Sequence, residues 1–299
     1  MDSSHGTGSQ LELVAMASAA ELKGGRSGRP QRRQPPRAEA LLPAGIPYAL
    51  HERDAVEWLR ELPDETVDLF ITDPPYESLE KHRAIGTTTR LKHSKSSSND
   101  WFRIFPNSRF PELFQEVYRV LARDRHFYLF SDAETMFVAK PAAEAAGFKF
   151  WKPLVWDKLR IGMGYHYRSR HEFILFFEKG KRKLSDLGVA DLIREKRIHR
   201  GYPTEKPVAV SRVLIEQSSL PGELVIDPFM GTASAGVAAV LGGRTFYGAD
   251  ISEKAIAIAE ERLAATGAER HSLPPGRNAI VPAGQLTLDM KTLATKDGD

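Results

Sequence analysis

Apolar runs with strand character alternate along this chain with segments of helical periodicity, and this alternation constrains its fold more than any other feature. The predicted strands cover 67–72, 126–130, 153–156, 172–177, 223–226 and 245–248. The predicted helices cover 51–62, 111–121, 133–146, 206–219, 235–241 and 252–263. Alternation of this kind predicts an α/β fold, in which helices cover both faces of a mostly parallel sheet.

Composition limits the class of protein. A chain of 299 residues with 41% hydrophobic and 27% charged residues can bury a sizeable core. No apolar run approaches the length of a membrane span and the N-terminus carries no signal-peptide core, so we expect a cytoplasmic protein without a membrane partner. The absence of cysteine excludes disulfides, thiolate metal sites and cysteine nucleophiles. The 9 histidines show no paired ligand spacing, so no metal is expected.

Three segments lack the periodicity of the rest. Residues 1–45 are rich in Gly, Ser, Ala, Arg and Pro, and 23–37 carries 6 basic residues and no acidic one. We expect a disordered tail there, which either contacts phosphates or merely keeps the chain in solution. Residues 77–100 are expected to form a mobile loop and 266–299 a C-terminal tail, which leaves 46–265 as one folded domain.

The first motif is the tetrapeptide that ends the apolar run 67–72. Asp73, Pro74, Pro75 and Tyr76 follow that predicted strand directly. In an open α/β sheet, ligands bind at the carboxyl ends of the strands. The tetrapeptide therefore presents a carboxylate, two rigid residues and an aromatic ring at a candidate site, although Asp-Pro-Pro also occurs in ordinary turns.

The second motif follows the predicted strand 223–226. The segment 227–234 leads into a helix, Gly231 lets its backbone approach a ligand, and the first amides of the helix favour a negative group. Asp250 ends the next strand, where an acidic residue can bind ribose hydroxyls. This unit is a candidate nucleoside site, and the lack of a G-x-G-x-x-G motif disfavours a dinucleotide. The alternative is an ordinary turn between a strand and a helix.

Two segments are candidates for nucleic-acid contact. The loop 158–171 combines Tyr165 and Tyr167 with several arginines and lysines, and such side chains stack on bases and bind phosphates. The alternative is a hairpin connection whose tyrosines are buried. Residues 179–201 are basic and irregular. Because the net charge of the chain is only +3, the distribution of the charge is more informative than its total.

Taken together, the motifs resemble those of the β group of DNA amino-methyltransferases, the N4-cytosine and N6-adenine DNA methylase family. In that family the Asp-Pro-Pro-Tyr motif comes first and the Asp-Pro-Phe-x-Gly motif comes near the C-terminus, a circularly permuted order. The segment 202–207 looks like the family's His-Pro-Thr-x-Lys-Pro motif, 131–133 like the motif after the next strand, and 162–168 like the DNA-facing loop. The resemblance covers 46–263 and implies a Rossmann-like methyltransferase fold.

The resemblance implies S-adenosyl-L-methionine as the cofactor. The residues that it assigns to cofactor binding are Asp227, Phe229, Gly231, Thr232, Asp250, Thr204, Lys206, Ser131 and Asp132. Lys206 has a physical reason to be among them, since the methionine carboxylate needs a cation. The chain departs from the family pattern at Ala233, which replaces a second glycine, and at Tyr202, which replaces histidine.

The resemblance also implies a catalytic set and a DNA-binding set. Asp73 and the Pro74 carbonyl would accept the N–H bonds of an exocyclic amine on a base that is flipped out of the duplex. Pro75 would keep the turn rigid and Tyr76 would stack on the base. The DNA-binding residues would be Tyr165, His166, Tyr167, Arg168 and Arg170. By its place in the family pattern, the segment 178–203 is expected to read a short target sequence.

The resemblance further implies a target base. Aspartate at the first motif position goes with the 6-amino group of adenine in this family, and serine with the 4-amino group of cytosine, so we expect an adenine-N6 enzyme, with cytosine N4 as the alternative. Methylation of cytosine at carbon 5 is excluded, because it needs a cysteine nucleophile. A methyltransferase acting on a protein glutamine or on RNA would have the two motifs in the opposite order, and a DNA-binding module without activity would need neither turn. Double-stranded DNA is the expected partner, and the family pattern allows a homodimer and a cognate restriction enzyme.

Overall fold

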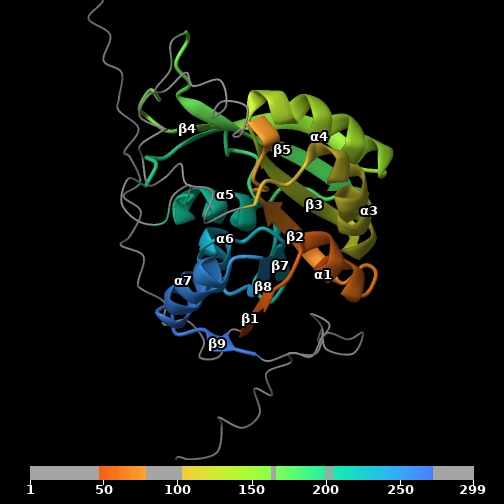
Figure 1. Cartoon of the computed structure of the whole chain (residues 1–299), viewed down its shortest axis with the longest axis vertical. Helices are drawn as coiled ribbons and strands as arrows, with labels where there is room; N and C mark the ends of the chain where they lie inside the picture. The colour runs from red at the N-terminus through yellow and green to blue at the C-terminus, as the bar shows by residue number, and fades with distance from the viewer. Residues whose placement is uncertain (1–46, 79–102, 163–165, 199–201, 203–204, 272–299) are drawn as a thin grey trace, which may run out of the picture. The chain divides into compact units, whose positions relative to one another are not determined.

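The computed structural model describes residues 47–78, 103–162, 166–198, 202 and 205–271. Its centre is a sheet of 9 strands in the order β6-β4-β5-β3-β2-β7-β8-β1-β9 (Figure 1). The strands are β1 (Pro47–Glu52), β2 (Val67–Thr72), β3 (Leu121–Ser131), β4 (Lys149–Asp157), β5 (His171–Lys179), β6 (Leu192–Arg194), β7 (Leu224–Asp227), β8 (Thr245–Asp250) and β9 (Glu269–Arg270).

The direction of the strands defines where a ligand can bind. Neighbouring strands pair in parallel except at β5, which is antiparallel to both β3 and β4. β2 and β7 lie side by side in the middle of the sheet, and the chain continues from β2 to β3 on one side and from β7 to β8 on the other. The carboxyl ends of β2 and β7 therefore meet where the strand order reverses, which is the point where open α/β sheets bind ligands.

Helices cover both faces of the sheet (Figure 1). They are α1 (Ala55–Glu61), α3 (Phe110–Val120), α4 (Ala133–Ala145), α5 (Val208–Ser218), α6 (Ser234–Leu241) and α7 (Glu253–Ala264), with a short 3-10 helix before α3 (Asn107–Arg109). Alternate residues of β2 serve the two faces. Phe70 packs in the apolar cluster with α1, α3 and α4, whereas Leu69 and Ile71 pack in the cluster with α5, α6 and α7. β2 is thus buried on both sides, as its continuous apolar run predicts.

The first predicted helix is wrong at its start. The sequence predicts a helix over 51–62, but His51 lies in β1 and the helix begins only at Ala55. The reason is Asp54, whose carboxylate accepts a hydrogen bond from the backbone N–H of Val56 (3.0 Å) and so caps the helix.

The other predicted helices and strands are confirmed, most of them with shifts of a few residues at their ends. The strands predicted for 126–130 and 153–156 are longer, as β3 and β4. Three strands were not predicted, namely β1, β6 and β9, and two of these are short pieces at the edges of the sheet. The predicted tail 1–45 lies outside the described residues, as do 79–100 of the predicted loop and the end of the chain from 272.

Candidate active site

The site lies at the carboxyl ends of β2 and β7. Thr72 ends β2 and donates a hydrogen bond from Oγ1 to Oδ1 of Asp227, which ends β7 (2.8 Å). Both side chains are buried. This bond joins the two strand ends, so the position of Asp73 is fixed relative to the turn that follows Asp227.

The Asp73 carboxylate has a donor on each oxygen. The hydroxyl of Tyr76 donates to Oδ1 and the ammonium of Lys206 donates to Oδ2. Tyr76 is buried, and burial together with the charge of Asp73 raises the pKa of Tyr76 well above its usual value. The Pro75 carbonyl accepts the backbone N–H of Phe105 (2.9 Å), which fixes the turn from a second side. The tetrapeptide is therefore held from both ends, with its carboxylate oriented.

A chain of alternating charges continues from Asp73. The Lys206 ammonium lies 3.3 Å from Oε2 of Glu172, and Nζ of Lys158 lies 2.6 Å from Oε1 of the same residue. Burial lowers the pKa of Lys206, but Asp73 and Glu172 outweigh it and hold the pKa above its usual value. Burial raises the pKa of Glu172, but the two ammonium groups outweigh it and hold the pKa below its usual value. Lys206 and Glu172 are therefore charged at neutral pH.

Two further carboxylates end strands in the second half of the chain. Asp227 also accepts the backbone N–H of Phe229 at Oδ1 (3.0 Å), and burial raises the pKa of Asp227 to about 7. Asp250 ends β8 and accepts the backbone N–H groups of Gly231 and Ser252 (both 2.9 Å), and burial raises its pKa as well. The predicted unit of strand, glycine turn, helix, strand and aspartate is therefore present, with Asp250 bonded to the glycine turn.

The turn between β7 and α6 uses left-handed backbone at Gly231 (φ 51°) and at Ala233 (φ 57°). Alanine adopts this conformation at a cost on the order of 1 kcal/mol, which explains why glycine is usual at the position of Ala233 in the family that the chain resembles. A Cβ atom built at Gly231 would meet no heavy atom of the other described residues within 4 Å, so the space beside it is open with respect to them. Since Ala233 has no polar side chain with which to cap α6, the first amides of α6 are left for other acceptors.

Arg262 holds this turn from α7, and sequence reasoning missed it. Its Nη1 donates to the carbonyl (2.6 Å) and to the hydroxyl (2.7 Å) of Thr232, and its Nη2 lies 3.0 Å from Oε1 of Glu205. Arg262 thereby ties the turn to the segment before α5 that carries Lys206. Nothing in the sequence distinguishes it from the other charged residues of the helix.

Ser131 ends β3, Asp132 follows it, and both have clear structural roles. Asp132 caps α4 by accepting the backbone N–H of Thr135 at Oδ1 (2.7 Å), and its Oδ2 accepts the hydroxyl of Ser78. Ser131 is fully buried and donates its hydroxyl to the Asp132 carbonyl (2.8 Å). These contacts link the end of β3 to the segment just after Tyr76. Contact with a cofactor stays a prediction for both residues.

The described part of the loop between β4 and β5 is mostly exposed. Four of the predicted DNA-binding side chains are exposed there: His166, Tyr167, Arg168 and Arg170. Arg170 also forms a two-pronged ion pair with Asp157 (2.6 and 2.8 Å), and these bonds hold the pKa of Asp157 below its usual value. Arg170 thus fixes the base of the loop. Tyr165 lies outside the described residues.

The segment 178–203 is partly structural. Lys179 is buried and donates to the carbonyls of Tyr118 (2.7 Å) and Leu121 (2.6 Å). Arg182 pairs with Glu223 (2.9 Å). The other basic residues that the structure describes in this segment are exposed: Lys181, Lys183, Arg194, Lys196 and Arg197. A role in reading DNA stays a prediction, and it falls to this exposed set.

The side chains at the two strand ends suit S-adenosylmethionine. A buried ammonium at Lys206 suits a carboxylate, the Asp250 carboxylate suits ribose hydroxyls, and the open space at Gly231 allows close approach to backbone amides. Phe229 is half-buried and packs edge-on against Phe105 (ring centroids 5.0 Å apart), which gives an apolar surface for a purine ring. Thr204 was also predicted for this set and lies outside the described residues.

Within the described parts of the chain, no three His, Asp or Glu side chains come together in a way that could hold a metal ion. No helix in those parts has the length and apolar character needed to cross a membrane.

Comparison with known proteins identifies the family. A family model described as DNA methylase, of the N6 and N4 type, matches residues 67–261. YubD of Escherichia coli K12, a protein named as a methylase, is 30% identical over 215 residues, which cover 71% of this chain and 88% of YubD. The DNA adenine methyltransferase YhdJ of the same organism is 27% identical over 251 residues, which cover 70% of this chain and 80% of YhdJ.

Solved structures share the fold. The complex of M1.HpyAVI with S-adenosylmethionine matches with a TM-score of 0.53 and 21% identity, over 72% of this chain and 100% of that one. The cytosine-N4-specific PvuII DNA methyltransferase matches with a TM-score of 0.57 and 14% identity, over 73% of this chain and 88% of that one. The fold expected from the sequence is thereby confirmed. Since the family model matches well over half of its residues, the chain belongs to the N6/N4 DNA methylases, a family of S-adenosylmethionine-dependent DNA methyltransferases.

Proposed function

We propose that this protein transfers a methyl group from S-adenosylmethionine to the N6 amino group of an adenine that is flipped out of a short sequence in duplex DNA. One observation carries the proposal. Asp73 stands at the strand-order reversal, and the bond from Thr72 to Asp227 (2.8 Å) joins its strand to the one that leads into the glycine turn. A methyl donor on that turn and an amine on Asp73 would therefore meet. The family match over 67–261 supports 46–265 as the catalytic domain.

Adenine is the proposed target for two reasons. Asp73 stands at the first position of the motif, where aspartate goes with adenine in the family pattern. YhdJ, which is named as an adenine methyltransferase, is among the relatives. Cytosine N4 is the alternative, because the PvuII enzyme shares the fold and is cytosine-N4-specific. Both targets are exocyclic amines, so the chemistry below holds for either.

Asp73 and Pro74 would activate the amine. The lone pair of such an amine is delocalised into the ring, which makes the nitrogen a weak nucleophile. The Asp73 carboxylate accepts one N–H and the Pro74 carbonyl accepts the other, which draws the nitrogen towards tetrahedral geometry. We assign Pro74 because the carbonyl of Pro75 is already bonded to Phe105 N–H (2.9 Å). As positive charge develops on the nitrogen, Asp73 stabilises it and accepts the proton that the nitrogen releases.

The second half of the chain would bind and orient the methyl donor. S-adenosylmethionine supplies the methyl group on an electrophilic sulfonium. Asp250 would bind the ribose hydroxyls and Lys206 would neutralise the carboxylate. Asp227, with a pKa of about 7, is partly protonated at neutral pH and so can both donate and accept a hydrogen bond. No covalent intermediate with the protein is needed, in keeping with a chain that has no cysteine.

A base inside a duplex cannot reach Asp73, so it must leave the stack. Tyr76 orients Asp73 through its hydroxyl and would offer its ring to the flipped base. The exposed Tyr167 and Arg168 would contact the DNA, and Arg170 would keep their loop in place through Asp157.

Long-read modification sequencing tests this proposal. DNA from a methylation-deficient host that expresses the protein is compared with DNA from a host that expresses the Asp73→Ala variant. We expect methylated adenine in one short motif, absent from the variant. This result would establish the reaction, the base and the recognition sequence together.

The other outcomes are equally informative. Methylated cytosine at N4 would overturn the choice of base and leave the chemistry intact. No modified DNA from a protein that binds S-adenosylmethionine would point to an amine outside DNA. A protein that binds DNA but no S-adenosylmethionine would be a binding module.

A further inference from the structure

Glu172 lies at the site but takes no direct part in the proposed methyl transfer. It is the second residue of β5. Because β5 runs antiparallel to its neighbours, its first residues reach the edge of the sheet where β3 and β4 end. The side chain of Glu172 is 26% exposed and contacts two ammonium groups. Its position therefore comes from the one reversal of direction in the sheet.

The two carboxylate oxygens of Glu172 differ. Oε1 lies 2.6 Å from the Lys158 ammonium. Oε2 is buried and accepts no hydrogen bond from any residue that the structure describes, although the Lys206 ammonium lies only 3.3 Å away. Lys206 donates to Asp73 instead. A buried acceptor without a hydrogen bond is unfavourable, so Glu172 gains if Lys206 turns towards it.

For Asp73, the hydrogen bond from Lys206 is a disadvantage during the reaction. In the proposed reaction, Asp73 must bind an amine and stabilise positive charge on the nitrogen. An ammonium ion bonded to the same carboxylate opposes both, because like charges repel most strongly at short range in a buried site. Lys206 cannot lose its proton easily, since its two carboxylate neighbours raise its pKa. It must therefore change partner, and because its Nζ already lies 3.3 Å from Oε2 of Glu172, a small turn of the ammonium is enough to form that hydrogen bond.

We propose that Glu172 is a positioning residue that takes Lys206 away from Asp73 when the target amine arrives, so that Asp73 meets the amine as a free carboxylate. An ammonium has three N–H donors, so Lys206 can bond Glu172 and the cofactor carboxylate at the same time. In the ligand-free protein the two carboxylates share one ammonium. Lys158 keeps Glu172 in place from the far side. The release of Asp73 rests on the proposed function, whereas the sharing of Lys206 is a property of the ligand-free protein.

The sharing is tested by thermal unfolding of the full chain without cofactor or DNA. Asp73→Asn and Glu172→Gln each leave Lys206 one carboxylate, and the double variant leaves it none. We expect the double variant to lose about 3 °C or more beyond the sum of the two single losses. In a Lys206→Met background this excess should vanish. Additive losses, or an excess that persists without Lys206, would overturn the sharing.

The release of Asp73 is tested by single-turnover methylation at saturating cofactor, on the DNA motif found by sequencing. We expect Glu172→Gln to slow transfer at least about tenfold and to change the Kd for S-adenosylmethionine less than about threefold. Added to Lys206→Met, the same change should slow transfer less than about threefold further. Asp191→Asn is the matched control, since it likewise replaces a carboxylate by an amide but breaks only an exposed ion pair with Lys152 (2.9 Å), and it should behave as wild type.

Three results would overturn the release of Asp73. The first is a wild-type transfer rate for Glu172→Gln. The second is an equal loss of transfer rate when Glu172→Gln is added to wild type and to Lys206→Met. The third is a change in the Kd for S-adenosylmethionine that accounts for the whole loss of rate. If Glu172→Gln alone does not fold, a Lys206→Met/Glu172→Gln double variant that transfers more than about threefold slower than Lys206→Met would still overturn the release. A wild-type protein that methylates no DNA would overturn the proposed function, while the unfolding experiment would still decide whether Lys206 is shared.

Discussion

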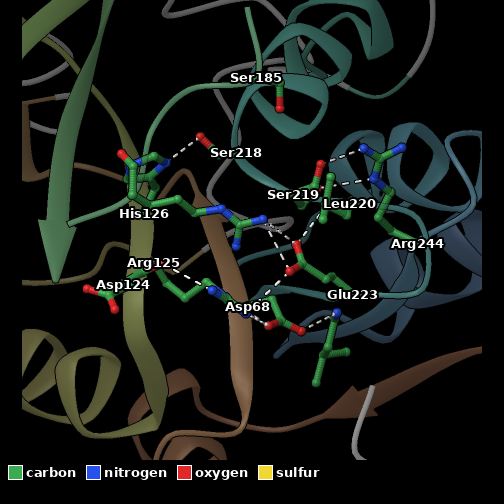
Figure 2. A network of polar contacts seen from close by, with 12 residues as sticks. Asp68, Asp124, Arg125, His126, Ser185, Ser218, Ser219, Leu220, Glu223 and Arg244 are labelled. Carbon is green, nitrogen blue, oxygen red and sulfur yellow. Dashed lines mark hydrogen bonds and ion pairs between the residues drawn. The ribbon is translucent and has the colours of Figure 1, made fainter. Parts of the chain in front are cut away.

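The two edges of the sheet bury charge in different ways. At the amino edge, Oδ1 of Asp68 pairs with Arg125 (2.8 Å) and Oδ2 accepts the backbone N–H of Leu224 (2.9 Å) (Figure 2). Glu223 lies between Arg125 (3.3 Å) and Arg182 (2.9 Å). Both carboxylates are thus held by planar guanidinium groups from fixed directions. This network joins the starts of β2 and β7 to β3 and to the segment after β5.

At the carboxyl edge, the cations that pair with Asp73 and Glu172 are lysines. Lys206 and Lys158 carry compact ammonium groups on flexible stems, which can change partner without losing a planar geometry. Among the described residues, one oxygen of Glu172 finds no hydrogen-bond donor, and Asp227 is buried with a raised pKa. Arginines thus hold Asp68 and Glu223 in fixed pairs, whereas the change of partner that we propose at Asp73 falls to a lysine. The first kind of site should affect stability, and the second should affect catalysis.

The largest effect is expected from Asp73→Ala at the carboxyl edge. This change removes the acceptor that orients the amine and stabilises its charge, so single-turnover methylation should fall at least about 10³-fold. Lys206 retains Glu172 as a partner, so the variant should remain folded. Circular dichroism and the Kd for S-adenosylmethionine serve as controls. A rate within tenfold of wild type would show that the proposed acceptor is wrong.

The next effect is expected from Glu223→Ala at the amino edge. Two guanidinium groups, of Arg125 and Arg182, lose a nearly buried partner, which should lower the free energy of unfolding by about 3 kcal/mol. The melting temperature should fall by about 6–12 °C. Well below that temperature, single-turnover methylation should stay within about threefold of wild type. A variant that melts normally and loses activity would reverse the roles of the two edges.

A smaller effect of opposite sign is expected from Asp227→Asn. The folded pKa of Asp227, about 7, lies above its usual value of 3.8, so folding favours the protonated carboxyl. The stability that this group contributes is present below about pH 4 and is lost as the pH rises through 7. Asparagine cannot ionise and keeps an Oδ1 acceptor for Thr72 and Phe229. Relative to wild type, the variant should therefore gain on the order of 2 kcal/mol between pH 4 and pH 6.

Melting temperatures of both proteins at several pH values in this range measure that gain. The exposed Asp191 is the matched control, because Lys152 lowers the pKa of Asp191, so folding favours its ionised carboxylate. Relative to wild type, Asp191→Asn should therefore lose stability slightly as the pH rises, the opposite sign to Asp227→Asn. A difference between Asp227→Asn and wild type that does not change with pH would show that Asp227 is ionised throughout.

The smallest effect is expected from Arg262→Ala. The change frees Thr232 and Glu205 but touches neither Asp73 nor the target amine. The Kd for S-adenosylmethionine should rise about tenfold while the rate at saturating cofactor changes less than about twofold. Isothermal titration calorimetry measures the first and single-turnover methylation the second. Arg212→Ala, which removes an exposed guanidinium 3.8 Å from Glu216, should change neither.

The sequence predicts best those helices and strands that combine a regular apolar pattern with a residue that ends or caps the element. β2 is a continuous apolar run that two prolines end, and α7 begins just after Ser252, whose hydroxyl accepts the N–H of Ala255 (3.3 Å). The strands that it misses lack such signals. β1 carries His51 and Glu52 at its end, and β6 and β9 are two or three residues long, so only their partners in the sheet make them strands.

The same division holds at the site. Motif order predicts Asp73, Gly231 and Asp250, because each follows a recognisable strand. Glu172 and Arg262 could not be predicted to join them. Glu172 reaches the site because β5 runs antiparallel to its neighbours. Arg262 reaches it from α7, the helix that follows β8. Both depend on strand order and direction, which local sequence patterns do not contain.

The antiparallel strand also has a consequence for how such an enzyme diversifies. β4 ends at Asp157 and β5 begins at His171, and these two residues pair directly. The connection 158–170 therefore leaves the sheet and returns to it at the same place. Residues can be inserted, removed or exchanged at its tip without shifting the register of any strand or moving Asp73. For protein engineering, this hairpin is a graft point, where a foreign loop can be inserted while Asp73 and its partners keep their places.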